Sequence, residues 1–264
     1  MANDQNPVYT GEALLHAVYS YRASNFGCDP DLFDTPGTSI SPRDNLYGDG
    51  VIYLYHLKKH AILRADPLLI PRLEQLVVQL DPSVPLTLDD LKVFFGAAHV
   101  NVDDVYPYFY LDPAAFTPVT VPEDVDVSLR RLAQSEYDKL DTLFSACSEQ
   151  DLEGADIWLN DPDPVIFCGF FGDQVVAYAS HRYMTAYGSL SCLADVIADV
   201  GVLIHPEFRG RGLGKAVVSA LSQWCIDHDK IPQYRLNQGH VRSRRIPESL
   251  GYTRLFEVTL IVVS

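Results

Sequence analysis

The sequence predicts an α/β protein in two parts, with its chemistry in the second part. Segments with strand-like alternation and segments with helix-like periodicity are interleaved along all 264 residues. Gly172-Asp173-Gln174 separates two apolar runs and is typical of a β-hairpin turn, which indicates antiparallel pairing. A glycine-rich turn at 209–215 joins an apolar strand to an amphipathic helix.

The composition of the chain argues against several classes of function. A net charge of -15 argues against a nucleic-acid partner. No apolar run approaches the ~20 residues that a membrane span needs, and the first residues do not resemble a signal peptide. The five cysteines are scattered without a Cys-x-x-Cys pair, so we expect reduced thiols, a cytoplasmic location and no metal site.

The first half alternates helical and strand patterns and carries no catalytic motif. We expect a helix at 10–26, a loop at 28–50, paired strands at 51–57 and 60–64, helices at 67–80 and 87–95, and a strand at 105–111. Three prolines at 113, 118 and 122 then indicate a linker. The predicted domains are an N-terminal α/β domain of unknown role at 1–112 and a second domain at 122–264.

The second half begins with a predicted strand at 125–132, a helix capped by Ser135 and an acidic loop at 148–164. The hairpin at 165–171 and 175–183 follows, then a strand at 193–204 in which Asp195 and Asp199 share one face. After the glycine turn we expect an amphipathic helix, a strand at 233–236, a helix at 241–250 and a strand at 254–263.

The glycine turn is suited to a phosphate. Gly210, Gly212 and Gly214 leave backbone N–H groups uncovered where a helix starts, and three cations flank them: Arg209, Arg211 and Lys215. A Walker loop is excluded, because its first glycine would fall at Arg209 and its Ser/Thr at Ala216. A Rossmann fingerprint is excluded as well, because it would need glycine at 215.

The pattern Arg-x-x-Gly-x-Gly does match, at Arg209, Gly212 and Gly214, and Ser243 precedes Leu250-Gly251-Tyr252 at a suitable distance. Together these features resemble the acyl-CoA motif of the Gcn5-related N-acetyltransferases (GNAT family), over about the last 140 residues. The resemblance implies a mixed, mostly antiparallel central sheet flanked by helices, with acetyl-CoA as co-substrate.

The resemblance also implies a set of cofactor contacts. The main chain of the central strand would meet the acetyl and pantetheine groups, the glycine turn would hold the pyrophosphate, and the start of the last helix would add side-chain contacts. The residues concerned are Val202, Leu203, Ile204, Arg209, Gly210, Arg211, Gly212, Leu213, Gly214, Lys215, His240 and Ser243.

Acyl transfer to an amine also needs a base for the ammonium and an acid for the leaving thiolate. Asp199 is the first candidate base and Asp195 the second. The resemblance places a tyrosine acid four residues after Ser243, but that position is Pro247. Tyr252 is the substitute we expect, with Ser249 nearby.

The predicted function is therefore transfer of an acetyl group from acetyl-CoA directly to a primary amine. A small cationic acceptor is favoured, because residues 1–200 are strongly acidic while residues 201–264 hold nine Lys/Arg against five Asp/Glu. The alternative is a non-catalytic acyl-CoA-binding or sensing protein, which the proline at 247 favours. We expect a small-molecule amine as partner, no membrane, and leave a homodimer open.

Overall fold

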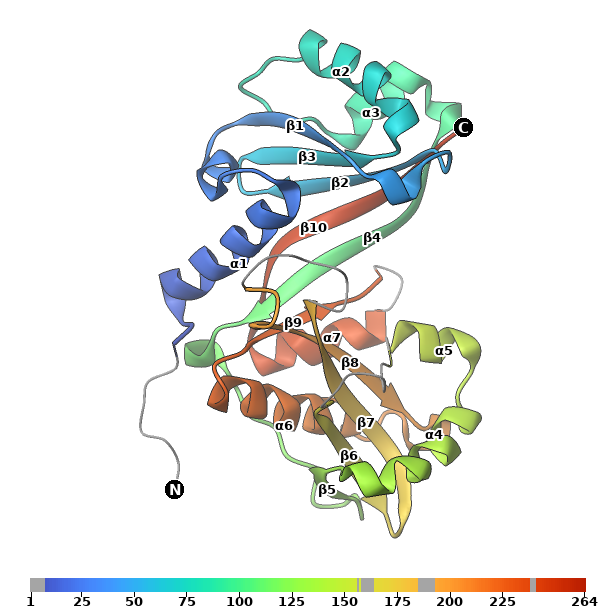
Figure 1. Cartoon of the computed structure of the whole chain (residues 1–264). Helices are drawn as coiled ribbons and strands as arrows, with labels where there is room; N and C mark the ends of the chain where they lie inside the picture. The colour runs from blue at the N-terminus through green and yellow to red at the C-terminus, as the bar shows by residue number, and fades with distance from the viewer. Residues whose placement is uncertain (1–7, 156, 158–163, 185–192, 238–240) are drawn as a thin grey trace. The chain divides into compact units, whose positions relative to one another are not determined.

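The computed structural model describes residues 8–155, 157, 164–184, 193–237 and 241–264. Ten strands in the described residues hydrogen-bond in the order β1-β3-β2-β10-β4-β9-β8-β7-β6-β5. The chain forms two compact units, and neither is continuous in sequence (Figure 1). Unit 1 comprises 1–21, 109–235 and 241–253, and unit 2 comprises 22–108, 236–240 and 254–264.

Unit 2 is built on strands β1 (Gly37–Pro42), β2 (Val51–Leu57), β3 (His60–Ala65), β4 (Val100–Leu111) and β10 (Tyr252–Val263). Strands β2 and β3 form the predicted hairpin, and β1 runs parallel to β3. Strand β10 pairs antiparallel with β2, from Val262 opposite Val51 to Glu257 opposite His56. The last eleven residues of the chain therefore belong to unit 2.

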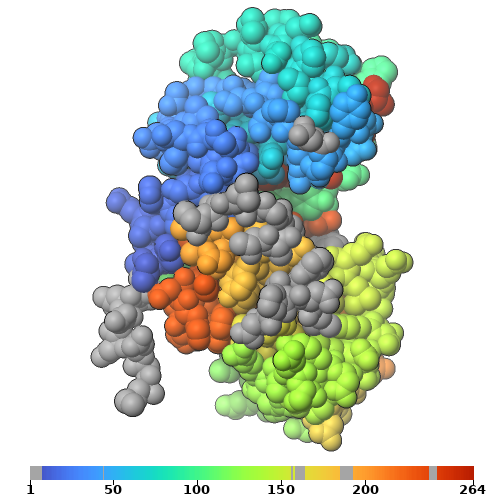
Figure 2. Space-filling model, viewed as in Figure 1, coloured from blue at the N-terminus to red at the C-terminus, as the bar shows by residue number. Residues whose placement is uncertain are grey.

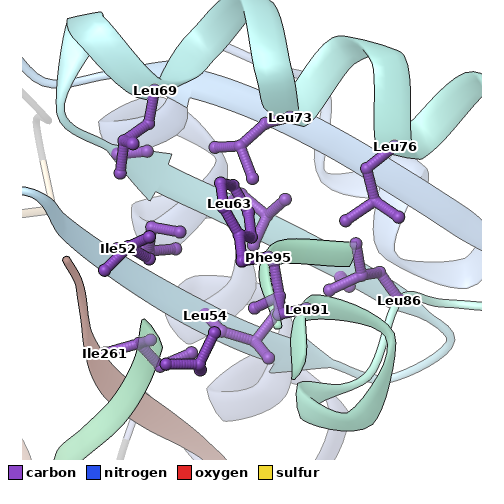
Figure 3. Packing of buried hydrophobic residues seen from close by; sticks show 14 residues of the cluster. Ile52, Leu54, Leu63, Leu69, Leu73, Leu76, Leu86, Leu91, Phe95 and Ile261 are labelled. Carbon is purple, nitrogen blue, oxygen red and sulfur yellow. The ribbon is translucent and has the colours of Figure 1, made fainter. Parts of the chain in front are cut away.

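One face of the unit 2 sheet is covered by α2 (Ile70–Gln79) and α3 (Leu88–Phe95). Leucines of both helices pack on Ile52, Leu54 and Leu63 of the strands (Figure 3). Thr87 caps α3, in a capping box with Asp90. Because one face of each helix is apolar and the alternate strand positions are apolar as well, burial of both surfaces stabilises this layer.

Unit 1 contains strands β5 (Ser128–Arg131), β6 (Ile166–Phe171), β7 (Gln174–Tyr183), β8 (Ile197–Ile204) and β9 (Ile231–Arg235). Strands β5 to β8 are antiparallel to their neighbours, whereas β8 and β9 are parallel. The unit's helices are α4 (Leu140–Ala146), α5 (Glu149–Gly154), α6 (Leu213–Asp227) and α7 (Val241–Leu250). The mixed, mostly antiparallel sheet with flanking helices is the predicted fold class.

Two predicted loops contain secondary structure. Strand β1 lies in the predicted loop at 28–50, where its sequence Gly-Thr-Ser-Ile-Ser-Pro is too polar to signal a strand. Helix α5 lies in the acidic segment at 148–164, capped by Ser148 and Asp151. The first helix, α1 (Gly11–Phe26), has the predicted bounds. The two predicted domains, 1–112 and 122–264, stay a prediction.

Candidate active site

Strand β8 is paired with strand β9 over its first three residues. Among the described residues, the β8–β9 ladder joins only Ile197–Asp199 to Ile231–Gln233. On its other side, β8 pairs with β7 from Ala198 opposite Tyr183 to Ile204 opposite Ala177. The main chain of the predicted contacts Val202, Leu203 and Ile204 therefore lies beyond the end of the ladder, where a ligand can reach backbone groups between two strands.

The glycine turn follows β8 directly. A 3₁₀ turn at Pro206–Phe208 leads to Gly210 and Gly212, whose φ angles are 79° and 82°. Both values lie in the left-handed region that glycine adopts without strain. Helix α6 begins at Leu213, and the Lys215 and Ala216 N–H groups donate to the Gly212 carbonyl. The N–H groups of the first residues of α6 point out of the N-terminal end of the helix, where an anion can accept hydrogen bonds from them.

Gly214 is needed for a different reason. A Cβ at this position would come within 3.1 Å of the Ile246 Cδ1 atom of α7. The glycine thus permits the close approach of α6 and α7, which carry the predicted pyrophosphate and Ser243 contacts respectively.

Two of the three cations of the turn already have protein partners. The Arg209 guanidinium lies 2.9 Å from the Asp151 carboxylate of α5 and donates from Nε to the Ile204 carbonyl at 3.2 Å. Arg211 donates to the Glu207 carbonyl at 3.0 Å and lies over the Phe208 ring. These contacts fix both guanidinium groups beside the turn.

Asp151 was not predicted as a site residue. A hydrogen bond from the Ser148 hydroxyl lowers the pKa of its carboxyl, and Arg209 lowers it further. The carboxylate is therefore charged at neutral pH and holds α5 to the turn. Helix α5 reaches the protein surface on the face drawn in Figure 2, in yellow-green.

Asp199 lies at the last rung of the β8–β9 ladder, with its side chain only 4% exposed. Its Oδ1 accepts a hydrogen bond from Gln233 Nε2 at 2.8 Å, and its Oδ2 accepts one from Arg235 Nε at 2.7 Å. The Tyr110 hydroxyl in turn donates to Gln233 Oε1 at 2.6 Å. Hydrogen bonds to both oxygens hold this carboxylate in one orientation.

Asp195, the second candidate base, lies outside strand β8. The described strand starts at Ile197, so Asp195 belongs to the turn before it and is exposed. The predicted strand at 193–204 was four residues too long at its start, and the expected shared face of Asp195 and Asp199 is wrong.

Ser243 has a phenol partner that the sequence did not indicate. The Tyr234 hydroxyl of β9 lies 2.8 Å from Ser243 Oγ of α7. Tyr234 follows Gln233, the last residue of the ladder, and burial raises its pKa to about 12. The phenol therefore keeps its proton at neutral pH. No sequence pattern pairs these two residues, because the contact joins two different elements.

Tyr252, the predicted acid, lies against α6. Its hydroxyl is 2.7 Å from Ser222 Oγ, and Ser222 itself donates to the Val218 carbonyl. Since a serine has one proton to give, Tyr252 is the donor in this pair. Burial raises the pKa of the Tyr252 hydroxyl. Pro247 lies inside α7 as expected, and His240 lies outside the described residues.

The described residues contain no group of three His, Cys, Asp or Glu side chains arranged to hold a metal ion. None of the described helices has the length and apolar character of a membrane span.

Comparison with known proteins places this half of the chain in a family. Residues 128–252 match the model of the acetyltransferase (GNAT) family. These residues form a GNAT acetyltransferase family domain, which includes β8, the glycine turn and α7. No curated protein matches the sequence at a significant level.

Solved structures that the chain is similar to share little sequence with it. A GCN5-related N-acetyltransferase from Kribbella flavida is 16% identical, with a TM-score of 0.45 over 66% of this chain and 63% of its own. A GCN5-related N-acetyltransferase-like protein from Streptococcus suis is 16% identical, with a TM-score of 0.44 over 81% and 84%. The yncA protein of Salmonella typhimurium, solved with its cofactor acetyl-CoA, is 16% identical, with a TM-score of 0.40 over 52% and 92%.

Proposed function

We propose that the protein transfers an acetyl group from acetyl-CoA directly to a primary amine. The observation that carries the proposal is the end of the β8–β9 ladder at Asp199, directly before the segment that leads into the glycine turn. A buried carboxylate, strand backbone beyond the end of the β8–β9 ladder and a family acyl-CoA motif then follow one another closely in the chain. Acetyl-CoA supplies the activated thioester.

The turn binds and orients the cofactor in this proposal. The α6 amides and the side chains of Arg209, Arg211 and Lys215 provide donors and positive charge for a pyrophosphate. The backbone N–H groups of β8 beyond the ladder are positioned to polarise a carbonyl oxygen as it gains charge. Leu203 is buried, which suits a role for its main chain and not its side chain.

Asp199 accepts the proton of the acceptor ammonium, directly or through one water. The hydrogen bonds from Gln233 and Arg235 orient the two carboxylate oxygens of Asp199. Arg235 is the better exposed partner, at 30% of its side chain. It positions the carboxylate at the point where the strands part.

Two phenols are candidates for the thiolate proton. Tyr252 is the one predicted from sequence, and its proton is engaged by Ser222. Tyr234 is the one that contacts the motif residue Ser243. We favour the Tyr234–Ser243 pair, because it lies between the end of the ladder and α7. The acceptor is proposed as a small cationic amine, on the acidity of residues 1–200 alone.

The second candidate function is an acyl-CoA-binding protein without turnover, which Pro247 favours. Asp199→Asn separates the two. For an enzyme, we expect kcat with the best acceptor of an amine panel to fall by about 10²- to 10⁴-fold, because a general base is lost. The dissociation constant for acetyl-CoA should stay unchanged.

Asp195→Asn is the matched control, because it removes a carboxylate from the exposed turn four residues earlier. It should leave both quantities unchanged. Thiol release from acetyl-CoA and calorimetric affinity are the measurements. Cofactor binding by the wild type without thiol release on any amine would favour the binding protein and contradict the transferase.

A further inference from the structure

A series of buried hydrogen bonds joins Asp199 to residues of two other strands of unit 1. Gln233 of β9 donates from Nε2 to Asp199 Oδ1 at 2.8 Å, and the Tyr110 hydroxyl of β4 donates to Gln233 Oε1 at 2.6 Å. Strands β4, β9 and β8 are consecutive in the sheet. Tyr110 is 1% exposed and Gln233 is completely buried, so these hydrogen bonds are shielded from water.

The direction of each hydrogen bond in this series follows from the groups that take part. A carboxylate only accepts, so the Gln233 amide turns its NH2 group toward Asp199. The same NH2 group contacts the sulfur of Met184 at 3.8 Å. The amide oxygen points the other way and can only accept, so Tyr110 is its donor. Groups on both sides of the amide therefore hold it in one orientation.

Apolar side chains could fill these positions at little cost in stability. A buried amide or phenol hydroxyl loses its hydration, and its internal hydrogen bonds do little more than replace what is lost. The polar series adds a defined orientation for Asp199 Oδ1, because buried hydrogen bonds polarise and strengthen one another. The other oxygen, Oδ2, accepts from Arg235, whose side chain is 30% exposed. The carboxylate is thus held from the interior on one side and lies beside a partly exposed group on the other.

Tyr110 lies outside the part of the chain that matches the family model. The match covers residues 128–252, which include Asp199 and Gln233, and Tyr110 precedes it. The end of β4 from Phe109 onward nevertheless belongs to unit 1, and β4 is the neighbour of β9 in the sheet. A residue that precedes the family domain thereby completes the surroundings of the candidate base.

We propose that Tyr110 is a positioning residue for the acetyl transfer proposed above, and that it acts on Asp199 through Gln233. The proposal rests on Asp199 being the base of that reaction. Tyr110 restrains the Gln233 amide so that an N–H group, and not the amide oxygen, faces the carboxylate. Loss of the phenol hydroxyl removes this restraint, so the N–H is less firmly directed at Asp199 and the base is held less well for the acceptor ammonium.

The first test measures kcat with the best acceptor of an amine panel and the dissociation constant of acetyl-CoA by calorimetry. Tyr110→Phe should lower kcat by about 5- to 20-fold and leave the dissociation constant unchanged, because it disturbs the base and not the cofactor site. Gln233→Glu, which turns an acceptor oxygen toward Asp199, should lower kcat at least as much. Tyr55→Phe is the matched control, because it removes a buried phenol hydroxyl from unit 2, and it should leave both quantities unchanged.

The second test follows the Gln233 amide itself, without any substrate. In ¹⁵N-labelled protein its NH2 group gives a pair of signals, which are identified by their loss in Gln233→Glu. In Tyr110→Phe these signals should shift and their protons should exchange with water faster, because the amide is less firmly held. In Tyr55→Phe they should keep their wild-type positions and exchange rates.

The two tests separate the role of Tyr110 from the transferase itself. In an active enzyme, a kcat of Tyr110→Phe equal to that of the wild type would overturn the role of Tyr110, and so would unchanged Gln233 signals. An equal fall of kcat in Tyr55→Phe would overturn it too, since the loss of any buried hydroxyl would then have the same effect. A wild type that acetylates no amine would contradict the transferase, and with it the role of Tyr110 in catalysis, whatever the amide signals show.

Discussion

The three glycines of the turn meet three different physical needs. Gly210 has open space around its Cβ direction, so its positive φ alone requires glycine. Gly212 also has a positive φ, and a Cβ there would lie 3.1 Å from the Pro122 ring. Gly214 allows the approach of Ile246. A substitution at 212 would therefore disturb the linker packing as well as any ligand.

His181 is a buried imidazole that costs stability in acid. Its side chain is 2% exposed, and neither ring nitrogen has a hydrogen-bond partner in the described part of the chain. Its ring stacks on that of Trp224 and is tilted against that of Tyr183. Burial lowers its pKa from 6.5 to about 4, with smaller contributions from Lys230 and Arg131.

The lowered pKa of His181 predicts how the free energy of unfolding depends on pH. Above pH 6.5 the ring is neutral in both the folded and the unfolded state and contributes no pH dependence. Below it, the unfolded chain takes up a proton that the folded chain refuses, so stability falls until about pH 4. At pH 5 the loss is about 2 kcal/mol. His181→Phe, which keeps an aromatic ring for the stack, should lose less stability between pH 7.5 and pH 5 in urea unfolding. An unchanged pH dependence would contradict this account.

Sequence reasoning named some residues of the candidate site and missed others. Asp199 could be named because it lies in the predicted central strand, and Arg209 and the glycines because they form a motif in one segment. Gln233, Arg235 and Tyr234 were missed, because their roles depend on which residue of another element faces them. That pairing is decided by strand register, which a single sequence does not display.

At the scale of elements, the amphipathic helix α6 was predictable because the residues of its buried face all lie in one continuous stretch of sequence. Leu213, Val217 and Leu221 recur there at helical spacing. Strand β1 was not, since Gly37, Thr38, Ser39 and Ser41 carry no large apolar side chain and leave Ile40 to pack against the core. Helix α5 did have a signal, the Ser148–Asp151 capping box, which its acidic surroundings obscured.

The contact between α5 and the turn predicts how cofactor affinity is set. Asp151 and a pyrophosphate would compete for Arg209, and two anions near one another repel. Asp151→Asn should therefore tighten acetyl-CoA binding by about 3- to 10-fold, a modest effect because the pair is partly exposed.

Glu149→Gln is the control for this prediction, since it removes an equal charge from the first turn of α5. It should leave the affinity unchanged in a calorimetric titration. Weaker binding by Asp151→Asn would instead mean that the ion pair is needed to orient Arg209.

At the scale of the whole molecule, each compact unit is assembled from segments that lie far apart in the sequence. Strands β4 and β10 each run from one unit into the other, at Tyr108–Phe109 and at Thr253–Arg254. In unit 2, β10 lies beside β2, about two hundred residues earlier in the chain (Figure 1). The linker prolines gave no sign of this, because the partner of a strand is set by long-range packing and not by local composition.

The central claim is that the glycine turn of the GNAT domain holds acetyl-CoA. The most direct test is calorimetric titration of acetyl-CoA into the wild type, Lys215→Glu and the control Lys92→Glu, which makes the same charge change on α3. We predict micromolar binding for the wild type and the control, about -8 kcal/mol, and at least tenfold weaker binding for Lys215→Glu. No binding by the wild type, or equal binding by all three proteins, would contradict the account.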